Sequence, residues 1–204
     1  MSFALDPQRR RSAQAIFRSA VDELQAVLQR LGDEQLDGVL ALAADVKRAW
    51  DRGGTFLICG NGGSAADSQH IAAELVGRFL ADRPGYRAEA LTVNTSTLTA
   101  VGNDYGFDHV FSRQVQAKGR AGDVLLVIST SGNSPNCVLA VEEARRQGLS
   151  VHGFLGSDGG RLLPLLDGAM VAPSDSTPKI QEIHITMGHL LCMILEQWQE
   201  VEDD

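Results

Sequence analysis

The sequence lacks the features that mark secreted and membrane-spanning proteins. Its 204 residues contain three cysteines, at positions 59, 137 and 192. An odd, widely spaced set is neither a disulfide framework nor a CxxC metal knuckle, so we expect a reduced, cytoplasmic setting. The opening stretch MSFALDPQRRRSAQ has no apolar signal-peptide core. No apolar run approaches the ~20 residues of a membrane span, so we expect no membrane association.

The chain also lacks an excess of positive charge. Lys and Arg number 18 against 26 Asp and Glu, which gives a formal net charge of −8. An acidic chain does not attract polyphosphate non-specifically, so we expect no nucleic-acid partner. The hydrophobic content of 44% is enough for a packed core. The length fits one domain, because a single core can grow to about 250 residues.

The apolar pattern predicts two long helices followed by an α/β unit. Residues 11–31 and 35–50 carry apolar side chains at helical spacing. Beyond Gly53, strand-length apolar runs alternate with helical stretches, which is typical of a parallel sheet covered on both faces. A last helix is expected at about 179–200. The expected strands are 55–59, 88–93, 123–130, 150–156 and 168–173.

We therefore predict one domain over 1–204, with a helical segment at 1–52 and an α/β core at 53–200. The two N-terminal helices have two open interpretations. They form either an added layer on the core or an oligomerisation surface.

A glycine-rich loop follows the strand at 55–59 and reads GNGGSAAD (60–67). Three glycines in four positions let the backbone adopt positive φ and approach a ligand. Ser64 is expected to cap a helix that starts at Ala65, and the free N–H groups there favour an anion. The spacing is neither a dinucleotide fingerprint nor a Walker loop, so a plain strand-to-helix turn is the alternative.

A serine-rich loop, STSGNSPN (129–136), follows the strand that starts at 123. Pro135 fits the first position of a helix, which makes Ser134 its N-cap. Hydroxyls and exposed amides can bind a phosphate without a basic side chain. The alternative is a decorated turn. Two such loops, each closing a strand and opening a helix, favour a phosphate site.

Further ordered motifs extend from about Gly53 to Gln197. They are RPGY (83–86), VGNDYGFDHVFSRQV (101–115), GSDGG (156–160) and KIQEIHI (179–185). With the two loops, they resemble the sugar isomerase (SIS) domain family and, within it, the phosphoheptose isomerases. The resemblance implies a three-layer α/β sandwich with a five-stranded parallel sheet, and a homotetramer assembled through the N-terminal helices. It implies no organic cofactor.

The resemblance also implies an activity. It is the isomerisation of D-sedoheptulose 7-phosphate to D-glycero-D-manno-heptose 7-phosphate through an enediol, at the start of ADP-heptose and lipopolysaccharide core synthesis. Moving a proton between C1 and C2 needs a base at carbon and an acid at the oxygens. The resemblance assigns Glu74 as the base and His189 as the acid.

The same resemblance implies one zinc ion per subunit, ligated by His70, Glu74, Gln181 and His189. His70 and Glu74 share a helix face at i and i+4. Gln181 and His189 are separated by about 12 Å along a helix axis. We therefore favour the proton-transfer pair over an essential metal.

The expected substrate contacts come from the two loops, from the acid–base helices and from VGND, for which a simple turn is the alternative. They are Asn61, Gly62, Gly63, Ser64, Glu74, Asn103, Asp104, Ser129, Thr130, Ser131, Ser134 and Gln181.

Two other functions are open. One is a non-catalytic SIS-domain tetramer that binds the replication initiator protein, and the other is an isomerase or sensor for another phosphosugar. The presence of His70, Glu74 and His189 together favours an enzyme. His109, His152 and His184 are assigned structural roles, and the Cys59 thiol is expected to be a small buried hydrophobe.

Overall fold

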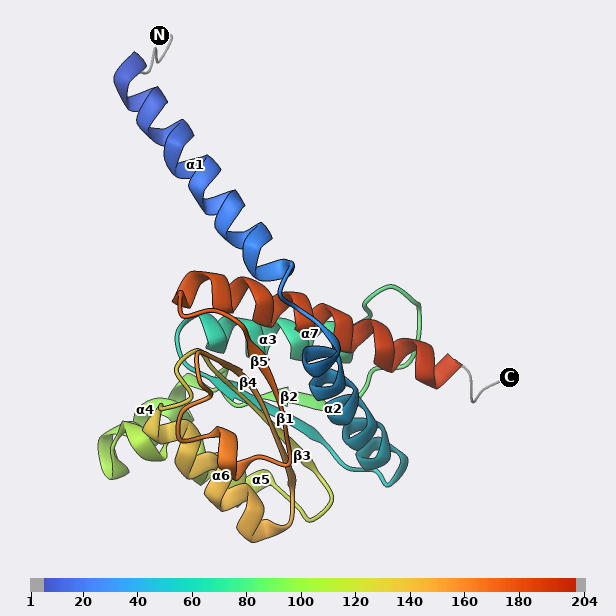
Figure 1. The fold of residues 1–204 in the computed structure, drawn as a ribbon. Helices are drawn as coiled ribbons and strands as arrows, with labels where there is room; N and C mark the ends of the chain where they lie inside the picture. Colours follow the sequence, from blue (N-terminus) through green and yellow to red (C-terminus); the bar gives the residue numbers. More distant parts are fainter. Residues whose placement is uncertain (1–5, 201–204) are drawn as a thin grey trace, which may run out of the picture.

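A five-stranded, all-parallel sheet lies at the centre of the structure, which is a computed structural model that describes residues 6–200. Helices cover both faces of this sheet, and one long helix extends away from it (Figure 1). The strands are β1 (Phe56–Gly60), β2 (Ala88–Ala90), β3 (Val124–Ser129), β4 (Ser150–Gly156) and β5 (Gly168–Ala172). The helices are α1 (Pro7–Leu28), α2 (Asp33–Asp51), α3 (Gly63–Val76), α4 (Thr95–Tyr105), η1 (Phe107–His109), α5 (Ser112–Lys118), α6 (Pro135–Gln147), η2 (Leu163–Leu165) and α7 (Thr177–Glu200).

The predicted three-layer α/β sandwich is confirmed. Each predicted strand is present, although β2 is shorter than expected because it pairs only with β1, over Ala88 to Ala90. Helices α2, α3 and α7 cover one face of the sheet, and α4, α5 and α6 cover the other (Figure 1).

Two hydrophobic clusters, one on each face of the sheet, hold the layers together. Along β1, Phe56 and Ile58 belong to the cluster beneath α2, α3 and α7. Leu57 and Cys59 belong to the cluster on the α5 and α6 side. This alternation is the two-residue period of a strand, and burial on both faces explains the continuous apolar runs in the sequence.

The strand order β2-β1-β3-β4-β5 fixes where a ligand can bind. From β1 the chain proceeds outward to β2, whereas β3, β4 and β5 follow in order on the other side. The order therefore reverses between β1 and β3. In open α/β sheets, ligands bind beyond the carboxyl ends of the strands at such a reversal. The two predicted phosphate loops follow these two strands.

The two N-terminal helices pack differently. Helix α2 lies against β5, and its Gly38 is so close that a β-carbon there would meet the Ala169 carbonyl oxygen at 2.3 Å. Helix α2 is therefore a layer of the core. In α1 only Val27 is buried, while Ile16 and Phe17 are 68% and 69% exposed. Among residues 6–200, no helix combines the length and apolar character required to cross a membrane.

Candidate functional site

The two predicted phosphate loops lie side by side at the carboxyl edge of the sheet. A reciprocal pair of amide hydrogen bonds joins them: Asn61 Nδ2 donates to Asn136 Oδ1 at 2.9 Å, and Asn136 Nδ2 donates to Asn61 Oδ1 at 2.8 Å. An open hollow of about 380 Å³ lies between the loops and η1. Its lining includes Asn61, Gly62, Phe107 and Ser134. The loops therefore form one surface.

The glycine-rich loop starts its helix earlier than the sequence predicts. Gly62, with φ 57°, is the N-cap, and α3 begins at Gly63. The prediction that Ser64 caps a helix starting at Ala65 is wrong. Ser64 lies within the first turn and is 3% exposed. Positive φ at Gly62 allows the tight turn, which leaves the first N–H groups of α3 at the carboxyl edge.

The serine-rich loop follows the prediction at its helix start. Ser134 is the N-cap of α6 and Pro135 its first residue, but the Ser134 side chain makes no capping bond. Its hydroxyl lies 3.3 Å from that of Ser129. Ser131 Oγ accepts from the backbone N–H of Asn133 at 3.2 Å. The hydroxyls are thus oriented locally rather than committed to capping α6.

The predicted acid–base residues meet between α3 and α7. His70 Nε2 lies 3.1 Å from Glu74 Oε1, and His189 Nε2 lies 3.3 Å from His70 Nε2. Ligand atoms of the three side chains all lie within 4.8 Å of one another. The His70 side chain is 44% exposed and that of Glu74 is 26% exposed. The group can therefore contact a ligand from solvent.

The same three side chains have the chemistry of a metal site. Two imidazoles and a carboxylate are ordinary zinc ligands. Tetrahedral zinc at about 2.0–2.1 Å from each nitrogen places its ligand atoms about 3.3 Å apart. The spacings of 3.1 and 3.3 Å match this value. The residues therefore fit a zinc ion.

Gln181 lies farther along the same pair of helices. Its amide packs on the backbone of Gly63, where a β-carbon would meet Gln181 Nε2 at 2.5 Å. Because α3 rises about 1.5 Å per residue, Gly63 is about 10 Å along the axis from His70. Gln181 thus lies beside the glycine-rich loop, and its part in the metal ligand set stays a prediction.

Asn103 and Asp104 lie at the end of α4 rather than in a turn. Asn103 Nδ2 donates to Asp104 Oδ1 at 2.7 Å, and both residues are exposed. Their predicted contact with substrate stays a prediction.

Sequence reasoning missed two residues beside the acid–base cluster. The Phe79 ring stacks on the His189 imidazole, with centroids 5.5 Å apart. Asp67, one turn before His70, has a buried Oδ2 without a hydrogen-bond partner among residues 6–200. Burial raises the pKa of Asp67, and the nearby His70 opposes that shift. No local pattern identifies Phe79, whereas the i, i+3 spacing of Asp67 and His70 is visible in the sequence.

His152, His184 and Cys59, which the sequence assigned to structure, are buried, whereas His109 is exposed in η1 and its structural role stays a prediction. His184 is fully buried, and its Nε2 is 2.9 Å from the Leu155 carbonyl oxygen. His152 Nε2 is 2.8 Å from Asp45 Oδ2. Cys59 is buried, and its neighbour Cys137, together with burial, raises the pKa of the Cys59 thiol well above its usual range. That thiol is therefore an unreactive core group.

Comparisons with known proteins identify the family of this chain. The profile of the SIS domain family matches residues 21–156. The phosphoheptose isomerase of Rhodospirillum rubrum is 54% identical over 183 residues, which cover 86% of this chain and 96% of that protein. The structure of a phosphoheptose isomerase from Neisseria gonorrhoeae superimposes with a TM-score of 0.81 at 41% identity, covering 92% of this chain and 98% of that one.

A second solved structure, a phosphoheptose isomerase from Francisella tularensis, gives a TM-score of 0.82 at 36% identity, over 93% of this chain and 98% of that one. The three phosphoheptose isomerases therefore match 86–93% of this chain. The chain belongs to the SIS domain family and, within it, to the phosphoheptose isomerases.

Proposed function

We propose that this chain isomerises D-sedoheptulose 7-phosphate to D-glycero-D-manno-heptose 7-phosphate by acid–base catalysis, with Glu74 and His189 as the proton-transfer pair. The observation that carries the proposal is the convergence of Glu74, His70 and His189 between two helices. The reaction places the enzyme in heptose supply for ADP-heptose and lipopolysaccharide core synthesis, in the cytoplasm.

Each proton has a place in this mechanism. The Glu74 carboxylate removes a proton from C1, while the protonated His189 imidazole donates a proton to the C2 carbonyl oxygen, which gives the enediol. His189 then takes the proton from the C1 hydroxyl, the C1 carbonyl forms, and Glu74 returns its proton to C2. His70, 3.1 Å from Glu74 Oε1, holds the carboxylate in place.

The two loops would bind the phosphate and the rest of the sugar. Four or five charge-assisted hydrogen bonds of about 1.5–3 kcal/mol each are enough to hold a phosphate dianion. Asn103 and Asp104 would bind sugar hydroxyls. Donors for the phosphate are Ser129, Thr130, Ser131 and Ser134, and the first loop adds Asn61, Gly62, Gly63 and Ser64, with Gln181 beside it.

We further propose that His70, Glu74 and His189 hold one zinc ion per subunit. Gln181 lies beside Gly63, about 10 Å along α3 from His70, so a glutamine ligand would come from a neighbouring subunit of the proposed assembly. Bound zinc would supply Lewis-acid chemistry at the same cluster. A carboxylate or imidazole nitrogen that ligates zinc is not free to transfer a proton, so the ion would compete with the acid–base roles of Glu74 and His189 and is not part of the proton-transfer steps above.

Elemental analysis of the purified protein, followed by chelation, tests this site. Loss of stoichiometric zinc together with a lower unfolding temperature would support it. Metal-free protein with unchanged stability and activity would remove zinc from the proposal.

A homotetramer is the assembly we propose, with α1 as a contact surface. Exposed apolar side chains on this helix support the proposal, because large exposed apolar surfaces mark association sites. They are Ile16, Phe17, Val21 and Leu28. Native mass spectrometry of the wild type and of Phe17→Ser tests it, and a wild-type monomer at micromolar concentration would contradict it.

A substrate panel tests the activity. Turnover of five-, six- and seven-carbon ketose phosphates is measured with the wild type and with Glu74→Gln. We expect preference for the seven-carbon sugar, and loss of turnover in the variant. Preference for a hexose 6-phosphate would overturn the substrate. Absence of turnover on every sugar would favour the non-catalytic partner of the replication initiator.

A further inference from the structure

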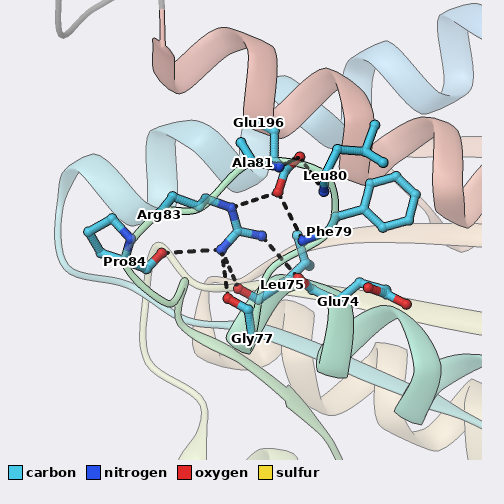
Figure 2. A network of polar contacts seen from close by, with 9 residues as sticks. All are labelled: Glu74, Leu75, Gly77, Phe79, Leu80, Ala81, Arg83, Pro84 and Glu196. Carbon is cyan, nitrogen blue, oxygen red and sulfur yellow. Dashed lines mark hydrogen bonds and ion pairs between the residues drawn. The ribbon is translucent and has the colours of Figure 1, made fainter.

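Arg83, in the RPGY motif, and Glu196, in α7, form a buried ion pair next to the acid–base cluster. Their side chains are 9% and 6% exposed, and Arg83 Nε donates to Glu196 Oε1 at 3.0 Å. Figure 2 shows the guanidinium surrounded by oxygen atoms. Its terminal nitrogens donate to the backbone carbonyls of Glu74, Leu75, Gly77 and Pro84 at 2.9–3.4 Å.

Arg83 therefore closes the carboxyl end of α3. The last carbonyls of a helix have no partner within the helix, and a cation there also interacts favourably with the helix dipole. The rest of the motif wraps the same helix end. Tyr86 donates its backbone N–H to the Leu75 carbonyl at 2.9 Å, and the guanidinium lies 3.9 Å from the centre of the Tyr86 ring. The turn that is closed in this way is the one that carries Glu74.

Glu196 binds the loop that follows α3. Its two carboxylate oxygens accept from the backbone N–H groups of Phe79, Leu80 and Ala81 at 3.0–3.3 Å (Figure 2). Burial raises the pKa of Glu196, but these donors and Arg83 outweigh burial and hold its pKa below the usual range. The carboxylate is therefore charged at neutral pH and fixes the loop backbone.

This loop contacts the proposed general acid. The Phe79 ring, whose own N–H binds Glu196, stacks on the His189 imidazole at an interplanar angle of 26°. Glu196 follows His189 by two helical turns in α7, so both side chains point from the same face. The Arg83–Glu196 ion pair thus connects two parts of the site. On one side is the turn of α3 that carries Glu74, and on the other are α7 and the Phe79 ring, which carry and contact His189.

We infer that Arg83 and Glu196 are positioning residues that set the placement of Glu74 relative to His189. This inference rests on the proposed function. Neither side chain is placed at the substrate, so their loss should lower kcat and leave the KM for the sugar phosphate largely unchanged. Partners that orient a reacting side chain are typically worth about 10- to 100-fold in activity.

The test compares Glu196→Gln with Asp123→Asn as a matched control. Both residues are buried, at 5% and 4% exposure, and both carboxylates accept from backbone N–H groups. Asp123 precedes β3, and its backbone partners Thr55 and Arg120 lie outside α3, α7 and the loop that Glu196 binds. Each substitution puts an amide nitrogen where an oxygen accepted a hydrogen bond, so both should lower the unfolding temperature.

Kinetics are measured well below both unfolding midpoints. We expect Glu196→Gln to lower kcat at least 10-fold with KM within about 3-fold of wild type, and Asp123→Asn to keep wild-type kcat. The ¹⁵N and ¹H NMR signals of the His189 ring should move in Glu196→Gln and not in Asp123→Asn. Equal kcat and unchanged ring signals in the two variants would overturn the inference.

A second variant approaches the pair from the other side. If the two residues act as one unit, Arg83→Met and the double variant Arg83→Met/Glu196→Gln should have kcat values within a few-fold of Glu196→Gln. Multiplicative losses in the double variant would contradict a shared role. Wild-type protein with no isomerase activity would instead refute the proposed function, and the His189 signals would still report on positioning.

Discussion

Gly132, in the serine-rich loop, has no room for a β-carbon. Its φ is 63°, and a β-carbon there would lie 2.0 Å from the Gly159 carbonyl oxygen and 2.4 Å from the carbon of that carbonyl. The left-handed conformation costs an alanine about 1–2 kcal/mol. Forced overlap with a packed neighbour costs about 1–3 kcal/mol more. Gly132→Ala should therefore lower the free energy of unfolding by about 2–5 kcal/mol.

Gly53→Ala is the control for this substitution. Gly53 has φ 74° and no atom within 4 Å of its β-carbon position, and it precedes β1 at the edge of the sheet away from the loops. It reports the backbone cost alone, about 1–2 kcal/mol. Urea unfolding of both variants gives the difference between their free energies of unfolding, which is the cost of the steric overlap at Gly132.

Activity provides the second measurement for Gly132→Ala. If the loop shifts to relieve the contact, one phosphate hydrogen bond worth about 1.5–3 kcal/mol is lost, so KM should rise roughly 10- to 100-fold. Gly53→Ala should keep the wild-type KM. Equal stability of the two variants, together with a wild-type KM for Gly132→Ala, would refute the account of this loop.

Two further predictions follow from charge. Asn61→Asp puts a carboxylate at the junction of the loops, so KM should rise at least 10-fold with kcat nearly unchanged; an unchanged KM would place the phosphate elsewhere. Burial lowers the pKa of His184 to about 4, although the hydrogen bond to Leu155 opposes that shift. The contribution of neutral His184 to the free energy of unfolding is therefore complete above pH 6.5 and is lost as the pH falls toward 4. Between pH 6.5 and 4 the free energy of unfolding of the wild type should fall by about 3 kcal/mol relative to that of His184→Leu. Parallel plots of unfolding free energy against pH for the two proteins would contradict this prediction.

Local patterns in the sequence predicted the elements and the loops. The apolar runs matched the strands because burial on both faces of a parallel sheet leaves a continuous signal. The start of α3 was predicted two residues late, because a positive φ at Gly62 replaces a serine cap and leaves no side-chain signature.

The pairing of Arg83 with Glu196 could not be predicted from spacing. The two residues lie 113 positions apart, and each looks like an ordinary surface charge in the sequence. Their burial follows only from the packing of α3 beside α7. The same packing joins His70 and Glu74 to His189, which the sequence linked through family resemblance alone.

The central claim is that Glu74 and His189 act on one substrate in one proton-transfer step. The most direct test is kcat for Glu74→Gln, His189→Gln and the double variant, with folding verified for each. Each single substitution should lower kcat by about 100-fold or more, and the double variant should be no more than a few-fold below the slower single. Full turnover by either single variant would contradict the claim.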